Sequence, residues 1–222
     1  MASQPSRDDE ARSQDAGQDA PRSISAKDVK ELRERTGAGM MDCKAALQEA
    51  EGDTDKAVEI LRVKGQAQAA KRGERTASEG AVSSYIHAGG KIGAMVEVNS
   101  ETDFVSRNEQ FQEFARDVAL HVAAAAPRYV SEDEVPEEDK EAELRVLREQ
   151  AAAEGKPEQV QQKMAEGRMG KWLDEVVLLR QTHVNADKYG GKTIEDLRTE
   201  IASNTGENVV IRRFARFAVG EE

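Results

Sequence analysis

Between residues 25 and 65, hydrophobic positions recur at the spacing of three short helices. Val29 and Leu32 fall on one helical face, and Ser25 with Asp28 three residues later is a capping-box-like start. Two more apolar faces follow, and glycines occupy the positions where a left-handed residue would end each helix. These faces consist of Ala45, Ala46, Leu47 and Ala50, and then of Ala57, Val58, Ile60 and Leu61. The pattern predicts a three-helix unit whose last helix ends at Gly65.

Beyond residue 80 the hydrophobic period changes to that of strands. Residues 91–99 are apolar at every second position from Ile92, and Ala88-Gly89-Gly90 separates them from residues 81–87. A β-hairpin is therefore expected here. Residues 209–219 are β-branched and aromatic enough for a final strand. Alternation breaks down through Arg212, Arg213 and Phe214, which predicts a bulge or a twist.

Several helices are expected between and around these strands. A long amphipathic helix is predicted from the spacing of Phe111, Phe114, Val118, Val122 and Ala125, with Pro127 just past its end. Residues 131–139 form an acidic loop, and residues 141–153 and 157–166 predict a helical hairpin. Thr193 and Asp196 begin a last helix that runs to Asn204. Helices mixed with antiparallel strands place the fold in the α+β class.

Composition divides the chain into four parts. Residues 1–22 are rich in Ser, Asp, Gln and Ala without a large apolar residue after Met1, so we expect a disordered tail. Residues 23–65 are the three-helix domain, 66–80 a polar linker and 81–222 the α+β core. The linker carries Lys71, Arg72 and Arg75. Their simplest interpretation is a solvated tether, and a ribosomal RNA contact is the alternative.

Charge and residue types restrict the function. The 222-residue chain has 43 acidic and 32 basic residues, and the net charge of -11 repels phosphate backbones, so direct nucleic-acid binding is not expected. No apolar run reaches the roughly 18 residues that a membrane span needs, and a single cysteine, Cys43, fits a reducing cytoplasm. The histidines lack paired metal-ligand spacing, and no nucleophile motif is present. We therefore expect no metal, no cofactor and no catalytic centre.

Three motifs carry a resemblance to a known family. Residues 30–44, KELRERTGAGMMDCK, closely resemble the N-terminal signature of the elongation factor Ts family. Residues 97–105, EVNSETDFV, resemble its second signature, and residues 165–169, AEGRM, resemble a third. The motifs occur in the family's order, and the resemblance covers residues 25–220.

The resemblance implies a guanine nucleotide exchange factor of translation elongation. Such a protein binds GDP-bound elongation factor Tu, disturbs its Mg²⁺ and phosphate site, and holds the nucleotide-free form until GTP binds. The three-helix unit would resemble a ubiquitin-associated domain and dock on the partner. The segment intruding near the Mg²⁺ would be Thr102, Asp103, Phe104 and Val105. Partner contacts would come from Leu32, Arg33, Thr36, Gly37, Ala38, Gly39, Met40, Met41, Lys44 and His121.

His121 leads to an expectation about assembly. It resembles a family histidine that presses on the phosphate-binding loop of elongation factor Tu. The 17 positions between Phe104 and His121 would span roughly 25 Å if helical. We therefore expect a homodimer in which one subunit presents Phe104 and the other presents His121.

Other interpretations of the same residues remain open. Without the motif, Phe104 is an ordinary core residue, Asp103 an ordinary loop acid or a helix cap, and His121 a packing residue on the apolar stripe of its helix. Met40 and Met41 form either a contact patch or core filling. The competing functions are a binding module for a peptide or ubiquitin-like partner, and a hydrolase that uses Asp103 and His121.

Overall fold

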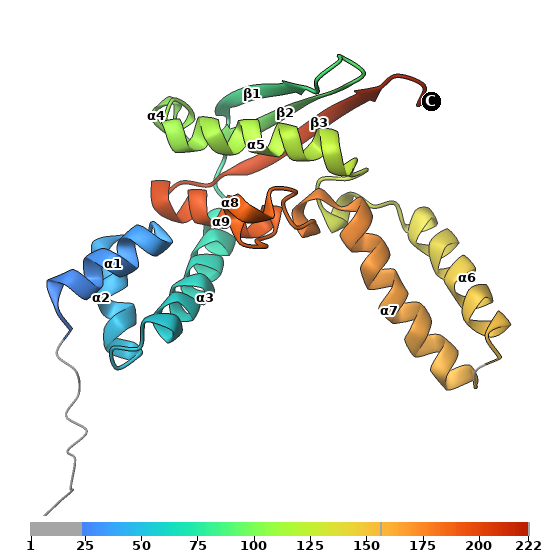
Figure 1. Cartoon of the computed structure of the whole chain (residues 1–222), viewed down its shortest axis with the longest axis horizontal. Helices are drawn as coiled ribbons and strands as arrows, with labels where there is room; N and C mark the ends of the chain where they lie inside the picture. Colours follow the sequence, from blue (N-terminus) through green and yellow to red (C-terminus); the bar gives the residue numbers. More distant parts are fainter. Residues whose placement is uncertain (1–23, 156, 222) are drawn as a thin grey trace, which may run out of the picture.

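The computed structural model describes residues 24–155 and 157–221, so the predicted tail at residues 1–22 lies outside the described residues. Its architecture is α+β, as predicted. A sheet of three antiparallel strands lies across the top of the view in Figure 1, with α5 packed along it. The α1–α3 unit and the α6–α7 hairpin extend from opposite ends of this core (Figure 1).

Helices α1, α2 and α3 form the N-terminal unit over Ala26–Thr36, Met40–Glu49 and Thr54–Arg72. The predicted capping box is present, since the Asp28 amide donates to Ser25 Oγ at 3.2 Å and the Ser25 amide donates to Asp28 Oδ2 at 2.9 Å. Gly37 ends α1 with φ of 69°. The small core is apolar and consists of Val29, Leu32, Cys43, Ala46, Leu47, Ala50 and Ala57.

The helix end predicted at Gly65 is wrong. Helix α3 continues through Gly65 to Arg72, so the first part of the expected linker is helical. Gly65 is buried, and a Cβ there would lie 3.4 Å from Ser203 Oγ and 3.9 Å from Thr199 Cγ2. The missing side chain therefore allows α3 to cross closely over α9 (Ile194–Thr205).

The sheet has the order β1-β2-β3, with strands Glu79–Ile86, Ile92–Ser100 and Val210–Ala218. Both pairings are antiparallel, which confirms the predicted hairpin. The register shifts where Glu97 pairs with Arg213 and Val98 pairs with Ile211, which leaves Arg212 as the extra residue. The predicted bulge is therefore confirmed.

One face of the sheet carries the core. Val96 and Val98 pack against Phe111, Phe114 and other apolar residues of α5 (Glu109–Ala125), the predicted amphipathic helix. Helix α9 closes the core from below (Figure 1). The opposite face is not covered by any described helix.

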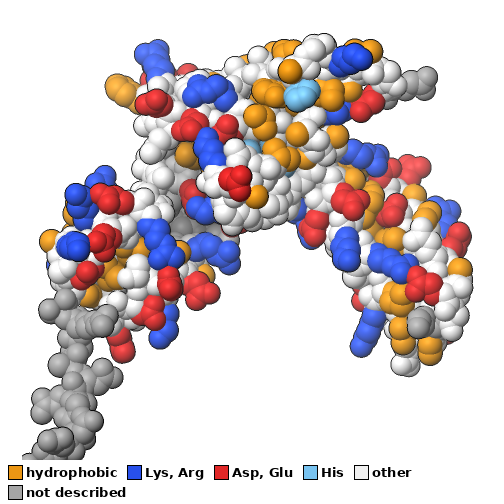
Figure 2. Space-filling view, in the orientation of Figure 1, with side chains coloured by type: hydrophobic (Ala, Val, Ile, Leu, Met, Phe, Trp, Pro, Cys, Tyr) orange, Lys and Arg blue, Asp and Glu red, His pale blue; other side chains and the backbone are white. Residues whose placement is uncertain are grey.

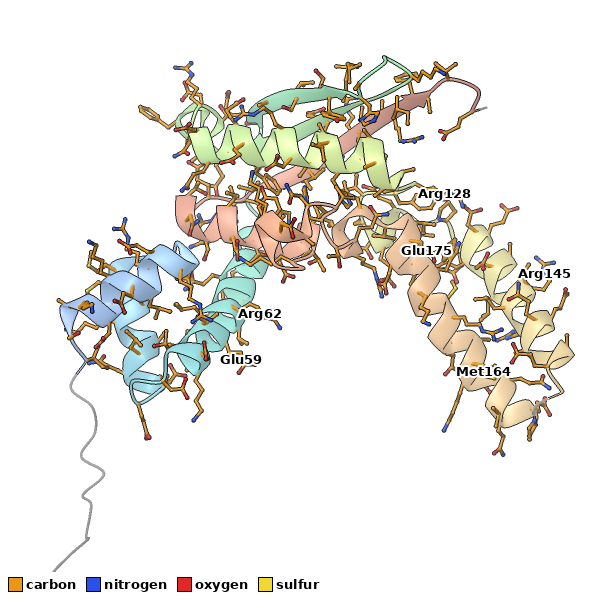
Figure 3. All side chains as sticks on the ribbon, viewed as in Figure 1. Glu59, Arg62, Arg128, Arg145, Met164 and Glu175 are labelled. Carbon is orange, nitrogen blue, oxygen red and sulfur yellow. The ribbon has the colours of Figure 1, made fainter. Side chains whose placement is uncertain are left out.

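The helical hairpin is confirmed and is longer than predicted. Helix α6 spans Glu137–Ala153, so it begins inside the expected acidic loop, and α7 spans Glu158–Val176. Figure 3 labels Arg128 and Glu175 where this hairpin leaves the core and Met164 farther along α7. At the base, Asp139 accepts hydrogen bonds from Tyr129 and Arg128. The remaining short elements are α4 (Asp103–Ser106), α8 (Ala186–Tyr189) and 3₁₀ turns at Glu132–Glu134 and Leu178–Arg180.

Charged side chains of both signs cover the N-terminal unit and the hairpin (Figure 2). Many are paired across short distances, as in the Arg35–Asp55 bridge at 2.8 Å. No helix in the described part of the chain is long and apolar enough to cross a membrane.

The contact at Gly65 yields a testable expectation. Gly65→Leu should lower the free energy of unfolding by about 1–3 kcal/mol, because a Cβ at this buried position already contacts Ser203 Oγ and Thr199 Cγ2, and a leucine would crowd both side chains. The matched control is Gly167→Leu in the middle of α7, where a Cβ would meet nothing within 4 Å. This control should be neutral, or stabilising by up to about 1 kcal/mol through helix propensity. Urea unfolding measures both variants, and equal midpoints would contradict the close crossing.

Candidate partner-binding site

Phe104 is displayed on the surface by the short helix α4 between β2 and α5. Its side chain is 86% exposed, whereas Val105 beside it packs against the core. The Asp103 carboxylate lies 3.1 Å from the guanidinium of Arg107 and is partly exposed. A large apolar ring held outside the core is costly to leave in water, and such patches commonly mark interaction sites. The interpretation of Phe104 as a core residue is therefore wrong.

Short-range hydrogen bonds hold the segment at residues 102–105. Ser100 Oγ donates to the Thr102 carbonyl at 2.9 Å, and Ser106 Oγ donates to the Asp103 carbonyl at 3.0 Å. Asn108 caps the following helix by accepting from the Gln110 amide at 2.8 Å. The ring therefore projects from a backbone that is bonded on both sides of it.

Met40 and Met41 begin α2 and are 53% and 73% exposed. This exposure agrees with a contact patch and excludes core filling. Arg33, Gly37, Gly39 and Lys44 are also exposed around this turn, and Thr36 and Ala38 are half-buried. Leu32 is fully buried, so its predicted direct contact with a partner is not available in this structure. Both the turn and α4 lie at the same end of the molecule (Figure 1).

Cys43 lies beneath this turn and is fully buried. Its thiol is 3.7 Å from the Ala38 carbonyl and 3.9 Å from Thr36 Oγ1. Burial raises the pKa of the Cys43 thiol above its ordinary value, which disfavours the reactive thiolate. A disulfide between subunits at Cys43 would therefore require this unit to open.

His121 is not available to a partner, and the predicted contact is corrected on this point. The side chain is fully buried on the core face of α5, seven residues after Phe114. The Val184 amide donates to His121 Nδ1 at 3.1 Å, which leaves Nε2–H to donate to Gln181 Oε1 at 2.9 Å. His121 is thus the packing residue that its position on the apolar stripe also predicted.

A second histidine completes this buried cluster. The rings of His121 and His183 stack with centroids 5.2 Å apart. His183 Nδ1 accepts from the Asn185 amide at 3.0 Å, and its Nε2–H donates to the Asp117 carbonyl at 3.1 Å. Sequence reasoning missed this pairing because the two histidines are 62 positions apart. Among the described residues, no group of three or more His, Cys, Asp and Glu side chains could hold a metal ion.

The uncovered face of the sheet is a second apolar surface that sequence reasoning missed. In register, Ile86 and Phe217 flank Gly93, and Met95 lies in the next row. Ile86, Met95 and Phe217 are 66%, 51% and 72% exposed. They line an open hollow of about 310 Å³ at Gly93, where a Cβ would lie 2.6 Å from Ile86 Cδ1. Figure 2 shows hydrophobic side chains gathered near the β1–β2 hairpin.

The comparisons with known proteins agree with the motifs. The sequence model of the family described as elongation factor TS matches residues 24–190. Curated relatives named elongation factor Ts include one from Alkaliphilus metalliredigens, 57% identical over 90% of this chain and 91% of the relative. A relative from Carboxydothermus hydrogenoformans is 55% identical over 89% of this chain and 90% of the relative. One from Caldanaerobacter subterraneus is 54% identical over 89% of this chain and 98% of the relative.

The buried histidines make stability depend on pH. Burial lowers the pKa of His121 to about 4, opposed by the hydrogen bond to Gln181 and assisted by His183. The folded pKa lies below the unfolded one, so this stabilisation is complete above about pH 6.5 and is lost as the pH falls toward 4. At about 1.4 kcal/mol per pKa unit, the loss from this residue approaches about 3 kcal/mol.

Urea unfolding of the native protein and of His121→Gln between pH 7 and pH 4 tests this expectation. Glutamine cannot titrate but retains a donor and an acceptor. The stability difference in favour of the native protein should shrink, or reverse, as the pH falls. A difference that stays constant across this range would contradict a neutral buried His121.

Proposed function

The chain belongs to the elongation factor Ts family, and from that premise we propose that it is the guanine nucleotide exchange factor of elongation factor Tu. It binds the GDP-bound form, promotes release of GDP, and holds the nucleotide-free form until GTP enters. The observation that carries this proposal is the exposed ring of Phe104 on a backbone that the fold holds in place.

Phe104 supplies a rigid anchor that can enter a gap between helices of the partner. Burying a phenylalanine side chain that was exposed is worth about 1.5–3 kcal/mol. Little conformational entropy is lost at binding, because the backbone on both sides of the ring is already hydrogen-bonded. Most of this free energy is therefore available to stabilise the open form of the partner.

Asp103 acts beside the ring through its charge. A carboxylate brought close to a Mg²⁺ site disturbs the waters and side chains that hold the ion. The Arg107 guanidinium lies 3.1 Å from this carboxylate on the same short segment, so Asp103 must leave this ion pair when it turns toward the partner. Loss of Mg²⁺ then weakens the hold of the partner on the GDP phosphates.

Exchange follows from linkage and needs no covalent step. If this protein binds the nucleotide-free partner more tightly than the GDP-bound partner, it must weaken GDP binding by the same factor. We therefore propose that the chain has no catalytic chemistry of its own. A hydrolase that uses Asp103 and His121 is not supported, because His121 is buried and occupied at both ring nitrogens.

The turn at Met40 and Met41 provides the second contact with the same partner. Flexible thioethers adapt to an apolar surface, and exposed Lys44 and Arg33 can pair with acids at the rim. The α1–α2 turn and α4, which carries Phe104, lie on the same side of the view in Figure 1, so both can face one partner. The binding-module alternative would use this turn alone and would leave Phe104 without a role.

We also propose a homodimer, now on different grounds from those in the sequence. A second copy is not needed to present His121, since that residue is buried in each chain. The open sheet face supports the dimer, because in a two-fold interface the same patch meets itself. Phe217 of one copy can then fill the hollow at Gly93 of the other.

Release of a fluorescent GDP analogue from elongation factor Tu tests the role of Phe104. Phe104→Ala should slow release at catalytic concentration by roughly 10- to 100-fold, because it removes about 1.5–3 kcal/mol of partner burial. The control is Val146→Ala, which truncates an exposed apolar side chain on α6, remote from the site, and should keep the native rate. If native protein does not accelerate release, the binding-module alternative gains instead.

Analytical ultracentrifugation tests the homodimer. Phe217→Asp places a charge in the proposed interface and should raise the dimer dissociation constant at least 10-fold. Val63→Asp is the control, because Val63 is 61% exposed on α3, outside the sheet. A native protein that sediments as a monomer at micromolar concentration would refute the dimer.

A further inference from the structure

The geometry points to Glu207 as a positioning residue that holds residues 102–105 in the orientation from which Phe104 and Asp103 meet the partner. The inference rests on the proposed exchange function and assigns a role to a residue outside the three recognised motifs. Glu207 lies between α9 and β3, 105 positions from Thr102.

The carboxylate of Glu207 makes three hydrogen bonds to the end of β2. Its Oε2 accepts from the Glu101 amide at 3.1 Å and from the Thr102 amide at 3.0 Å. Its Oε1 accepts from Thr102 Oγ1 at 2.6 Å. Bonds to an ionised acceptor are stronger than neutral ones. One side chain therefore fixes both the backbone and the side chain at the residue that precedes α4.

The carboxylate of Glu101 makes a second connection, from the residue after β2 to the start of β3. Glu101 Oε1 accepts from the Asn208 amide at 2.6 Å, and the Arg75 guanidinium lies 3.4 Å from the same oxygen. Asn208 Nδ2 donates to the Arg75 carbonyl at 2.8 Å. The start of β3, the end of β2 and the chain leaving α3 are thus joined at one point.

The hydrogen bonds of the Glu207 and Glu101 carboxylates form a brace between β2 and β3. The position of Phe104 depends on this brace because its ring makes little contact with the core. At 86% exposure, its direction is set by the backbone on either side. Val105 and Ser106 anchor the segment on the C-terminal side through packing and a hydrogen bond. On the N-terminal side, Thr102 is exposed and its own side chain does not cap α4, so Glu207 and Ser100 provide the anchors.

The side-chain hydrogen bonds of Glu207 are directed to the segment before α4 and not to the hydrophobic core. The residue is half-buried, and all three of its bonds go to the segment before α4. Gly206 before it adopts φ of 74° and ends α9, which turns the chain toward β2. The end of α9 therefore places the Glu207 carboxylate, and that carboxylate holds the segment from which the Phe104 ring projects.

A double-mutant cycle on GDP release tests this role. Glu207→Gln keeps the size of the side chain but removes its charge, so the hydrogen bonds from the Glu101 and Thr102 amides lose the strength that an ionised acceptor gives them. We expect release to slow about 10-fold when Phe104 is present. In a Phe104→Ala background the same substitution should change release less than 2-fold, because the ring that it positions is gone. Equal slowing in both backgrounds would overturn the inference.

Glu195→Gln is the matched control for this cycle. Glu195 carries its carboxylate on α9, where it pairs with Arg198 of the same helix and, within the described part of the chain, makes no hydrogen bond to residues 101–106. It should leave release unchanged in both backgrounds. If Glu207→Gln slows release no more than Glu195→Gln does while Phe104→Ala slows it strongly, the exchange proposal stands and the positioning role is refuted.

Fluorescence anisotropy of the isolated protein separates the positioning role of Glu207 from the proposed role of Phe104 in exchange. With Trp172→Phe and Phe104→Trp, the single remaining tryptophan reports on the segment. Glu207→Gln should lower its fluorescence anisotropy, and Glu195→Gln should not. Unchanged anisotropy would overturn the brace. Lowered anisotropy together with no effect of Phe104→Ala on release would support the brace and refute the role of Phe104 in exchange.

Discussion

The packing of α5 against one face of the three-stranded sheet is the constraint on which the other features depend. Phe111 and Phe114 contact Val96 and Val98, and this contact fixes the distance between the end of β2 and the start of α5. The connection between these elements must then cross the edge of the core in a few residues. Val105 faces inward and Phe104 outward for this reason, so an ordinary core contact determines where the exposed ring is displayed.

Helix α5 also determines the environment of His121. Its position on the buried side of α5 takes the imidazole out of water, and the structure compensates by giving each nitrogen a partner. A buried polar group in this state stabilises one tertiary arrangement of α5 and the segment after η2, the 3₁₀ turn at Leu178–Arg180. A residue so engaged can influence partner binding only through the core that it helps to hold.

Features with local causes were predictable from the sequence. The capping boxes at Ser25 and Thr193 arise within a few residues, and the loss of alternation at Arg212 that marks the bulge is visible in its own strand, so all three were expected correctly. Gly65, His121 and Glu207 were misread or missed because their partners lie far along the chain. A glycine at a close crossing looks like a glycine that ends a helix until the crossing helix is known. The exposure of Phe104 could be anticipated only from the motif around it, since a lone phenylalanine is more often buried.

Exposed apolar side chains on an acidic chain with only 4% aromatic residues are costly, and their placement is informative. Phe104 and the methionine turn share one end of the molecule, whereas Phe217, Ile86 and Met95 lie on the open sheet face. The first group lies on the short helix α4 and on the first turn of α2, which suits a small contact with a partner that must later leave. The second is broad and lies on a regular sheet, which suits a lasting contact between identical faces. Two surfaces of different construction on different elements are what the two proposals need, because the proposed dimer and the proposed exchange of a second partner then use separate parts of one chain.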